Sequence, residues 1–388
     1  MRLLRHYRRV LLISAILVLL FVVPWWTLVA APSWPTPVAV LGSVLVGLCF
    51  VGLPCLLFLG QGPRQSDAAA AVGVTLLGVT WVVFSWSVLG NLAGLGLLAA
   101  GVPDPARSRL VAVAVLVVAL ALAGWGVFEA RRVPRVRALD VVIPGLGAEL
   151  DGLRLAVITD THFGPLDRAN WSAKVAEAVN ALRPDLACHA GDLADGSVAR
   201  RHRQVDPLAS VRAELGKFYI TGNHEYFGEA QAWLDYMGGI GWAPLHNRHQ
   251  VVCRGGDRLV IAGIDDPTGA GRLPGHGPDL PAALAGADPA LPVVLLAHQP
   301  KQVAQAVEAG VALQISGHTH GGQIWPFHYL VRLDQPVLAG LSRHGGGGAG
   351  ATSGGTQLYT SRGTGFWGPP LRVFAPSEIT LLTLRAPG

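Results

Sequence analysis

The segment VALQISGHTH, residues 311–320, places a short apolar run directly before a glycine and two histidines. An apolar run of this length that ends in Gly317 is typical of a buried strand followed by a turn. His318 and His320 are separated by one residue, so both side chains can face one ligand if the chain turns after the strand. The segment therefore predicts a strand whose carboxyl end carries two histidines with a shared ligand.

Four other apolar runs in the C-terminal part of the chain also end in polar residues. They cover residues 155–159, 185–190, 218–221 and 293–297, and they precede Asp160, Gly191-Asp192, Gly222-Asn223-His224 and His298. Segments with helical spacing, such as 172–182 and 229–237, alternate with these runs, which predicts an α/β domain with mixed or parallel sheets. Sites in open α/β folds gather at the carboxyl ends of strands. We therefore expect the five polar clusters to meet at one edge.

Each cluster alone has a simpler interpretation. Asp160 would serve as a helix N-cap, Asp192 as part of a turn, and His298 as a hydrogen-bonded core histidine. Together, however, these side chains are too costly to bury at so many strand ends without partners, and one shared metal site would satisfy them all. Oxygen and imidazole ligands favour Mn, Fe, Zn or a similar divalent ion. The four cysteines show no paired spacing, so neither a disulfide framework nor a Cys-type zinc site is expected.

The order of the clusters resembles the motif order of the calcineurin-like metallophosphoesterase family. That order is D-x-H, G-D, G-N-H-[DE], H and G-H-x-H, and all five motifs stand in this order within residues 153–384. The segments 317–324 and 361–370 are similar to those of a membrane-associated bacterial subgroup. The resemblance implies a two-sheet α/β sandwich, hydrolysis of a phosphoester, and a dinuclear metal centre with two divalent ions (Mn, Fe or Zn).

The resemblance also implies a role for each motif residue. In the implied arrangement Asp192 bridges two ions, the first held by Asp160, His162 and His320, and the second by Asn223, His298 and His318. A hydroxide that bridges the ions would attack phosphorus. His224 would stabilise the transition state or protonate the leaving oxygen, and Asp195 would orient His224. Asp265 and Asp266 precede a proline and are typical of a turn, while His189 is expected to pack beside the metal site.

The N-terminal part of the chain has the composition of a membrane segment. The chain is 51% hydrophobic and only 14% charged, whereas soluble domains are about 25% charged. Residues 10–63, 68–103 and 110–128 contain no Asp, Glu, Lys or Arg, and a spanning helix needs about 20 apolar residues. We predict an all-α region of about four spans, near 10–30, 38–60, 68–90 and 110–129. The predicted parts are a transmembrane region (1–132), a linker (133–152) and a metallophosphoesterase domain (153–388).

Arginines flank the first and last predicted spans. The two clusters are Arg2, Arg5, Arg8 and Arg9, and Arg131, Arg132, Arg135 and Arg137. Arginines next to a span can also attract anionic lipid head groups. With four spans both clusters fall on one side, and the positive-inside rule makes this side cytoplasmic. We thus expect a multi-pass protein of the cell membrane with a cytoplasmic catalytic domain. The glycines at 90, 94 and 96 could instead mark a re-entrant turn or a fifth span, which would place that domain outside.

The sequence thus favours a membrane-anchored phosphomonoesterase or phosphodiesterase that acts on a lipid-linked or nucleotide-linked substrate. A nuclease is disfavoured, because the C-terminal part lacks a run of basic residues alternating with aromatic ones, and no nucleic-acid partner is expected. A membrane sensor or transporter with a metal-binding, non-catalytic domain is the alternative. Transport would favour polar residues inside the spans, where only isolated ones such as Asn91 occur. Nothing in the sequence indicates an oligomeric state.

Overall fold

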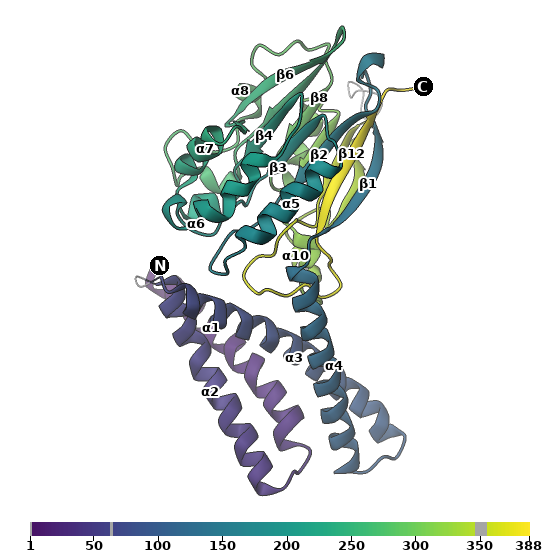
Figure 1. Ribbon diagram of the computed structural model, residues 1–388. Helices are drawn as coiled ribbons and strands as arrows, with labels where there is room; N and C mark the ends of the chain where they lie inside the picture. The colour runs from purple at the N-terminus through teal and green to yellow at the C-terminus, as the bar shows by residue number, and fades with distance from the viewer. Residues whose placement is uncertain (1, 63–64, 346–354) are drawn as a thin grey trace. The chain divides into compact units, whose positions relative to one another are not determined.

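The computed structural model describes residues 2–62, 65–345 and 355–388. The chain divides into two compact units (Figure 1). The first comprises Met1–Glu129 and Gly368–Val373, and the second comprises Ala130–Trp367 and Phe374–Gly388.

Long apolar helices make up most of the first unit. They are α1 (Arg2–Trp25), which continues into a π-helical turn (Trp26–Ala30), α2 (Thr36–Gln61), α3 (Asp67–Ala99) and α4 (Ala106–Arg131). Four helices in the described part of the chain are long and apolar enough to cross a membrane. The predicted all-α region of about four long apolar helices before the second unit is confirmed.

Helix α3 runs without a break through the glycines at which the sequence allowed a re-entrant turn or a fifth span. Small residues let helices approach closely in a membrane, and Gly90 and Gly94 serve that purpose, whereas a Cβ atom at Gly96 would have no neighbour within 4 Å. A Cβ atom at Gly90 would lie 2.4 Å from Val115 of α4, and one at Gly94 would lie 3.3 Å from Val111. Asn91 donates a hydrogen bond of 2.7 Å to the hydroxyl of Thr27. Gly90 and Gly94 therefore pack α3 against α4, and none of these glycines ends the helix.

Two six-stranded sheets form the second unit. The first sheet has the order β1 (Arg135–Val142), β12 (Glu378–Arg385), β2 (Leu153–Ile158), β3 (Leu186–Ala190), β4 (Gly216–Ile220) and β5 (Ala243–Pro244). The strands β2 to β5 are parallel, whereas β12 is antiparallel to β2.

The second sheet has parallel central strands and antiparallel edges. Its order is β10 (Gly340–His344), β11 (Thr356–Thr360), β9 (Leu313–Ser316), β8 (Val293–Leu296), β7 (Asp257–Gly263) and β6 (Arg248–Arg254). The strands β7, β8, β9 and β11 are parallel, and β6 and β10 pair antiparallel to their neighbours.

The main core lies between the two sheets. Leu155 and Phe218 of the first sheet belong to one buried cluster with Leu296 and Ile315 of the second. Full burial of such a side chain stabilises the fold by about 1.5–3 kcal/mol. The sheets therefore pack face to face, which confirms the predicted two-sheet α/β sandwich.

Helices pack on the outer faces of both sheets, and α5 on the first sheet can be seen in Figure 1. Val175 of α5 and Trp233 of α7 pack on Ala187 of the first sheet, and Ala306 of α9 packs on Leu295 of the second. The α-helices described in this unit are α5 (Ala169–Ala181), α6 (Val198–Val205), α7 (Ala230–Gly239), α8 (Leu280–Leu284), α9 (Val303–Glu308) and α10 (His328–Val331).

The stretch 133–152, which the sequence predicts as a linker, contains β1 and a 3-10 turn (Ala148–Leu150). Strand β1 pairs in parallel with β12 from Arg135 to Val142. It is an edge strand, and only Val141 among its residues is buried. An edge strand with so few buried residues lacks the apolar run by which the other strands are recognised in the sequence.

Candidate metal centre

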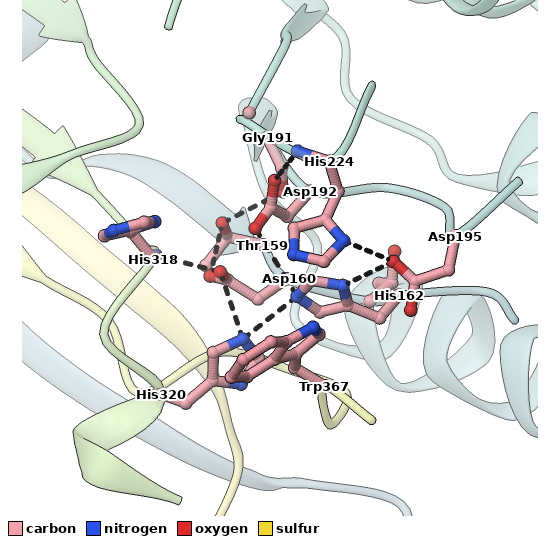
Figure 2. Close-up of polar contacts among 12 residues, drawn as sticks. Thr159, Asp160, His162, Gly191, Asp192, Asp195, His224, His318, His320 and Trp367 are labelled. Atoms are coloured by element: carbon pink, nitrogen blue, oxygen red, sulfur yellow. Dashed lines mark hydrogen bonds and ion pairs between the residues drawn. The ribbon is translucent and has the colours of Figure 1, made fainter. Parts of the chain in front are cut away.

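The five polar clusters lie together at the carboxyl ends of five strands. The strands are β2, β3 and β4 of the first sheet, with β8 and β9 of the second. Figure 2 shows side chains from the loops after these strands pointing toward one another. The structure brings together seven side chains that the sequence analysis proposed, namely Asp160, His162, Asp192, His224, His298, His318 and His320. Asn223 stands next to His224 in the loop after β4.

The loops that carry these side chains have an unusual backbone. Asp160, His162, Asp192, His318 and His320 all have a positive φ, between 43° and 70°. Such values are uncommon for residues other than glycine, and they cluster at functional sites. The loop after β2 is tied to the loop after β3, because the Asp160 N–H donates to the Gly191 carbonyl over 2.9 Å. The backbone thus holds the polar side chains in fixed positions.

Two of the motif glycines are required by close approach. A Cβ atom at Gly317 would lie 2.1 Å from Oδ2 of Asp160, and one at Gly222 would lie 2.2 Å from Oδ1 of Asp192. These distances are far below van der Waals contact, so no larger residue fits without displacing a carboxylate. The glycines in the G-N-H and G-H-x-H motifs therefore allow the carboxylates to occupy the centre.

One group of candidate ligands consists of Asp160, His162 and His320, all buried. The Nε2 atoms of His162 and His320 are 3.0 Å apart, and Nε2 of His320 lies 3.5 Å from Oδ1 of Asp160. Thr159 donates from its hydroxyl to Oδ2 of Asp160 over 2.8 Å. Two imidazole nitrogens at this separation beside a carboxylate are suited to hold one cation between them.

A second group consists of Asp192, His298 and His318. Nδ1 of His298 lies 2.8 Å from the Ala190 carbonyl, to which it donates, so that Nε2 points to Asp192, 3.2 Å away. Burial, followed by the charge of His298, lowers the pKa of His318 to about 3. A neutral imidazole is the form that binds metals.

Two buried atoms of this region test whether a metal ion fits. Oδ1 of Asn223 and Nε2 of His298 are buried, and neither has a hydrogen-bond partner among the described residues; Nε2 of His298 faces only the charge of Asp192, 3.2 Å away. Buried polar atoms normally have partners. Burial lowers the pKa of His298, but the charges of Asp192 and Asp160 raise it well above its usual value, so the surroundings favour a cation at this position. A divalent ion beside Asp192 would satisfy Nε2 of His298, and Oδ1 of Asn223 in the loop after β4 offers a further ligand.

Asp192 lies between the two groups. Its Oδ2 atom is 3.5 Å from Nε2 of His162 and 3.2 Å from Nε2 of His298. Its Oδ1 atom accepts a hydrogen bond of 2.9 Å from the His224 N–H. Burial opposes ionisation of Asp192, but the charges of His298 and His224 lower its pKa well below the usual range. Asp192 is thus a carboxylate that reaches both groups.

Asp195 contacts two histidines at once. Its Oδ1 atom is 2.7 Å from Nδ1 of His224 and 3.0 Å from Nδ1 of His162 (Figure 2). Burial lowers the pKa of His224, but the charges of Asp192 and Asp195 raise it to about 9. The contact with His162 was not expected from the sequence. A carboxylate on the second nitrogen of a metal-binding histidine fixes the orientation of the ring.

Glu225 is a structural residue of the site that the sequence analysis did not single out. Its buried carboxylate accepts hydrogen bonds from the N–H groups of Asp192, Leu193 and Gly222, at 3.1, 2.8 and 2.6 Å. It therefore ties the loop after β3 to the loop after β4. The sequence signal for it exists, because Glu225 fills the acidic fourth position of the G-N-H-[DE] motif.

Aromatic rings surround His224. The rings of Phe227 and Trp367 meet it edge to face, with centroids 5.2 and 5.9 Å away. Both side chains are exposed on their other sides. They form an apolar wall beside the candidate ligands, and Trp367 comes from the segment 361–370 that carries part of the family resemblance.

His246, Asp265 and His276 form a further group outside these loops. Nδ1 of His246 lies 2.8 Å from Oδ1 of Asp265, and Nδ1 of His276 lies 3.1 Å from the Tyr226 hydroxyl. The turn expected at Asp265 and Asp266 is present, since Asp266 accepts from Thr268 N–H at the start of a 3-10 turn. His246 and His276 therefore already have hydrogen-bond partners within the protein, Asp265 and Tyr226.

Comparison with known proteins agrees with the geometry of the site. Residues 153–322 match the family described as calcineurin-like phosphoesterase. An uncharacterized metallophosphoesterase of Helicobacter pylori (strain J99) is 36% identical over 269 residues, which make up 68% of this chain and 68% of that protein. The chain belongs to the calcineurin-like metallophosphoesterase family. Members of this family use divalent metals, and the candidate ligand groups support a metal-dependent phosphoesterase here.

Two animal relatives are named as transmembrane proteins. Proteins named "transmembrane protein with metallophosphoesterase domain" are 35% identical over 277 residues in Danio rerio and 33% over 271 residues in Bos taurus. The matched residues are 70% and 67% of this chain. The chain spans only 62% and 59% of the length of these relatives. Their names and the four apolar helices indicate that this metallophosphoesterase associates with a membrane.

Proposed function

We propose that this metallophosphoesterase is a membrane-anchored hydrolase of phosphomonoesters or phosphodiesters that works with two divalent ions. The position of Asp192 carries the proposal. One oxygen of this buried carboxylate lies within 3.5 Å of a histidine from each ligand group. A carboxylate has two oxygens and can bridge two ions, whereas an amide offers one carbonyl oxygen. A single-ion site would not need this arrangement.

In the proposed centre each ion has its own ligands. Asp160, His162 and His320 would hold the first, Asn223, His298 and His318 would hold the second, and Asp192 would serve both. Two divalent ions (Mn, Fe or Zn) would lower the pKa of a water molecule that attacks phosphorus and would stabilise charge on the phosphate oxygens.

His224 is the proposed general acid. Its Nδ1 atom faces Asp195 over 2.7 Å, which leaves Nε2 as the atom that can donate a proton to the leaving oxygen. Its raised pKa, about 9, keeps the ring protonated at neutral pH. A positioned acid of this kind accelerates a reaction by about 10²–10⁴-fold. Asp195 orients the ring and stabilises its charge.

The proposed substrate is a lipid-linked or nucleotide-linked phosphoester, and the membrane helices support the lipid-linked one. The arginines that flank the first and last spans support a multi-pass arrangement in the cell membrane with a cytoplasmic catalytic domain. A non-catalytic sensor or transporter domain would be expected to lack some of the motif residues. Every motif residue is present, which supports catalysis over that alternative.

Hydrolysis of p-nitrophenyl phosphate and its bis ester by the full chain in detergent tests the proposal. The protein is first freed of metal, and Mn²⁺, Zn²⁺ or Fe²⁺ is then added back. We expect turnover that depends on metal and is lost in Asp192→Asn, and the preferred ester would distinguish a monoesterase from a diesterase. A folded, metal-loaded protein that hydrolyses neither ester would favour the sensor alternative.

A further inference from the structure

A cavity of about 570 Å³ lies beside the start of α5, apart from the candidate metal ligands. None of those ligands lines it. Its wall includes three arginines, two aromatic residues and one acid: Arg131, Arg168, Arg203, Trp171, Phe366 and Asp167. A volume of this size accommodates a small organic ligand. All lining residues belong to the second unit.

The cavity carries an excess of positive charge. Three arginines and one aspartate line it, and Oδ1 of Asp167 already accepts from the Ala169 N–H over 3.0 Å. Arg131 and Arg203 are exposed, and neither forms an ion pair with a residue in the described part of the chain. These two arginines therefore offer charge and hydrogen-bond donors to an anion that enters the cavity.

The inner wall is rigid. The guanidinium of Arg168 stacks on the rings of Phe366 and Trp171, 4.3 and 4.9 Å from their centroids. It also donates to the carbonyls of Thr161 and His162. The indole N–H of Trp171 donates to the Arg132 carbonyl over 3.0 Å. The cationic group is thus fixed before a ligand arrives, so that little conformational entropy is lost on binding.

Helix α5 adds to the attraction. It is 13 residues long and begins at Ala169, and its first three residues line the cavity. The N-terminus of a helix carries partial positive charge and free N–H groups that favour phosphate. The three arginines and this helix end therefore act on the same space.

We propose that this cavity binds the phosphate group of an anionic membrane lipid. Arg131 is the last residue of α4, which is a candidate membrane span. An arginine at the end of a span is placed at the level of lipid head groups. Guanidinium groups bind phosphate through paired, charge-assisted hydrogen bonds. The site holds the lipid phosphate next to the loop of His162 without contacting the proposed catalytic atoms.

Competition between lipids in one micelle tests this proposal. The full chain is kept in a neutral detergent with equal amounts of a phosphatidylglycerol and a phosphatidylcholine that have the same acyl chains. The retained lipid is then counted by native mass spectrometry. We expect one phosphatidylglycerol to be retained in preference to phosphatidylcholine. In Arg203→Gln its retention should fall about fivefold to tenfold, because an arginine–phosphate contact is lost.

The control for this loss is Arg200→Gln, since Arg200 is another exposed arginine of α6 that does not line the cavity. It should retain phosphatidylglycerol as the wild type does. Arg131→Gln should weaken retention like Arg203→Gln, and circular dichroism would show that each variant is folded. Arg203→Lys should have a smaller effect than Arg203→Gln, because it keeps the charge but loses the paired donors.

Three results would overturn the proposal. The first is equal retention of phosphatidylglycerol by the wild type and by both glutamine variants. The second is equal retention of the two lipids by the wild type. The third is displacement of phosphatidylglycerol by inorganic phosphate at a similar concentration, which would make free phosphate the ligand. None of these measurements depends on hydrolysis, so the lipid site and the proposed catalytic function are tested independently.

Discussion

The metal centre and the arginine cavity belong to the same unit and share the peptide bond between Phe366 and Trp367. Phe366 stacks on Arg168 of the cavity, and Trp367 faces His224 of the centre. In the metal centre the polar atoms are buried, and two of them have no hydrogen-bond partner among the described residues. In the cavity, Arg131 and Arg203 are exposed and carry their charge in contact with water.

This difference shows how strongly each region depends on its ligand. A buried polar atom without a partner costs about 1–3 kcal/mol, so the centre needs a cation to be satisfied. An exposed arginine has no such cost, because water solvates it. Single substitutions should therefore have very large effects in the centre and graded effects in the cavity.

The largest effect is expected for Asp192→Asn. The amide keeps the shape of the side chain but removes the charge that faces His162 and His298. We expect loss of bound metal, measured by elemental analysis, and a loss of turnover of more than about a thousandfold. Asp235→Asn, an exposed acid on α7, is the control. Normal metal content and turnover in Asp192→Asn would contradict the proposed centre.

His224→Ala should separate chemistry from metal binding. We expect both ions to remain, because the ligands are untouched, while kcat falls about 10²–10⁴-fold through loss of the acid. His202→Ala on α6, whose ring pairs with Asp206 at 3.5 Å, is a matched control. A variant with wild-type turnover would remove His224 from the mechanism.

Asp195→Asn should change the pH profile. The pKa of His224 is raised to about 9, in part by Asp195, so the acid form persists up to about this pH and activity falls as the pH rises through it. Without the carboxylate the pKa of His224 drops, and the alkaline loss of activity should begin at a lower pH. A profile of kcat against pH measures the shift, with Asp206→Asn as the control. An unshifted alkaline limb would mean that Asp195 does not act on His224.

The smallest effect is expected for Trp367→Ala. The ring contacts His224 from one side and is about half exposed. We expect a change of a few-fold in KM or kcat, since an aromatic contact is worth about 0.5–1.5 kcal/mol. Lipid retention should stay unchanged, because Trp367 does not line the cavity. A parallel loss of lipid would show that the two regions are coupled through the peptide bond that they share.

Local sequence patterns determined much of this protein. Apolar runs that end in Asp160, Asp192, Asn223, His298 and His318 predicted strands whose ends meet, and each run is a strand in the structure. Charge-free runs of sufficient length predicted four spans. Both kinds of pattern are local, because burial in a sheet or in lipid imposes a composition on consecutive residues.

Other features depend on contacts between residues that are distant in sequence. Strand β1 is defined by its pairing with β12, more than 200 residues away, and its exposed residues leave no apolar signal. The role of Gly90 and Gly94 in α3 is clear only from their contacts with Val111 and Val115 of α4. Whether such a glycine interrupts a helix or lets it pack against another helix depends on the residues that lie next to it in the fold.

The sequence by itself thus determined the family, the spans and the set of polar residues at the strand ends. Only the tertiary structure showed that Asp195 contacts both His162 and His224, and that Glu225 ties two loops together. It alone placed Arg131, Arg168 and Arg203 around one cavity. The residue type determines what a side chain can bind, but the packing of the sheets and loops determines which partners it meets.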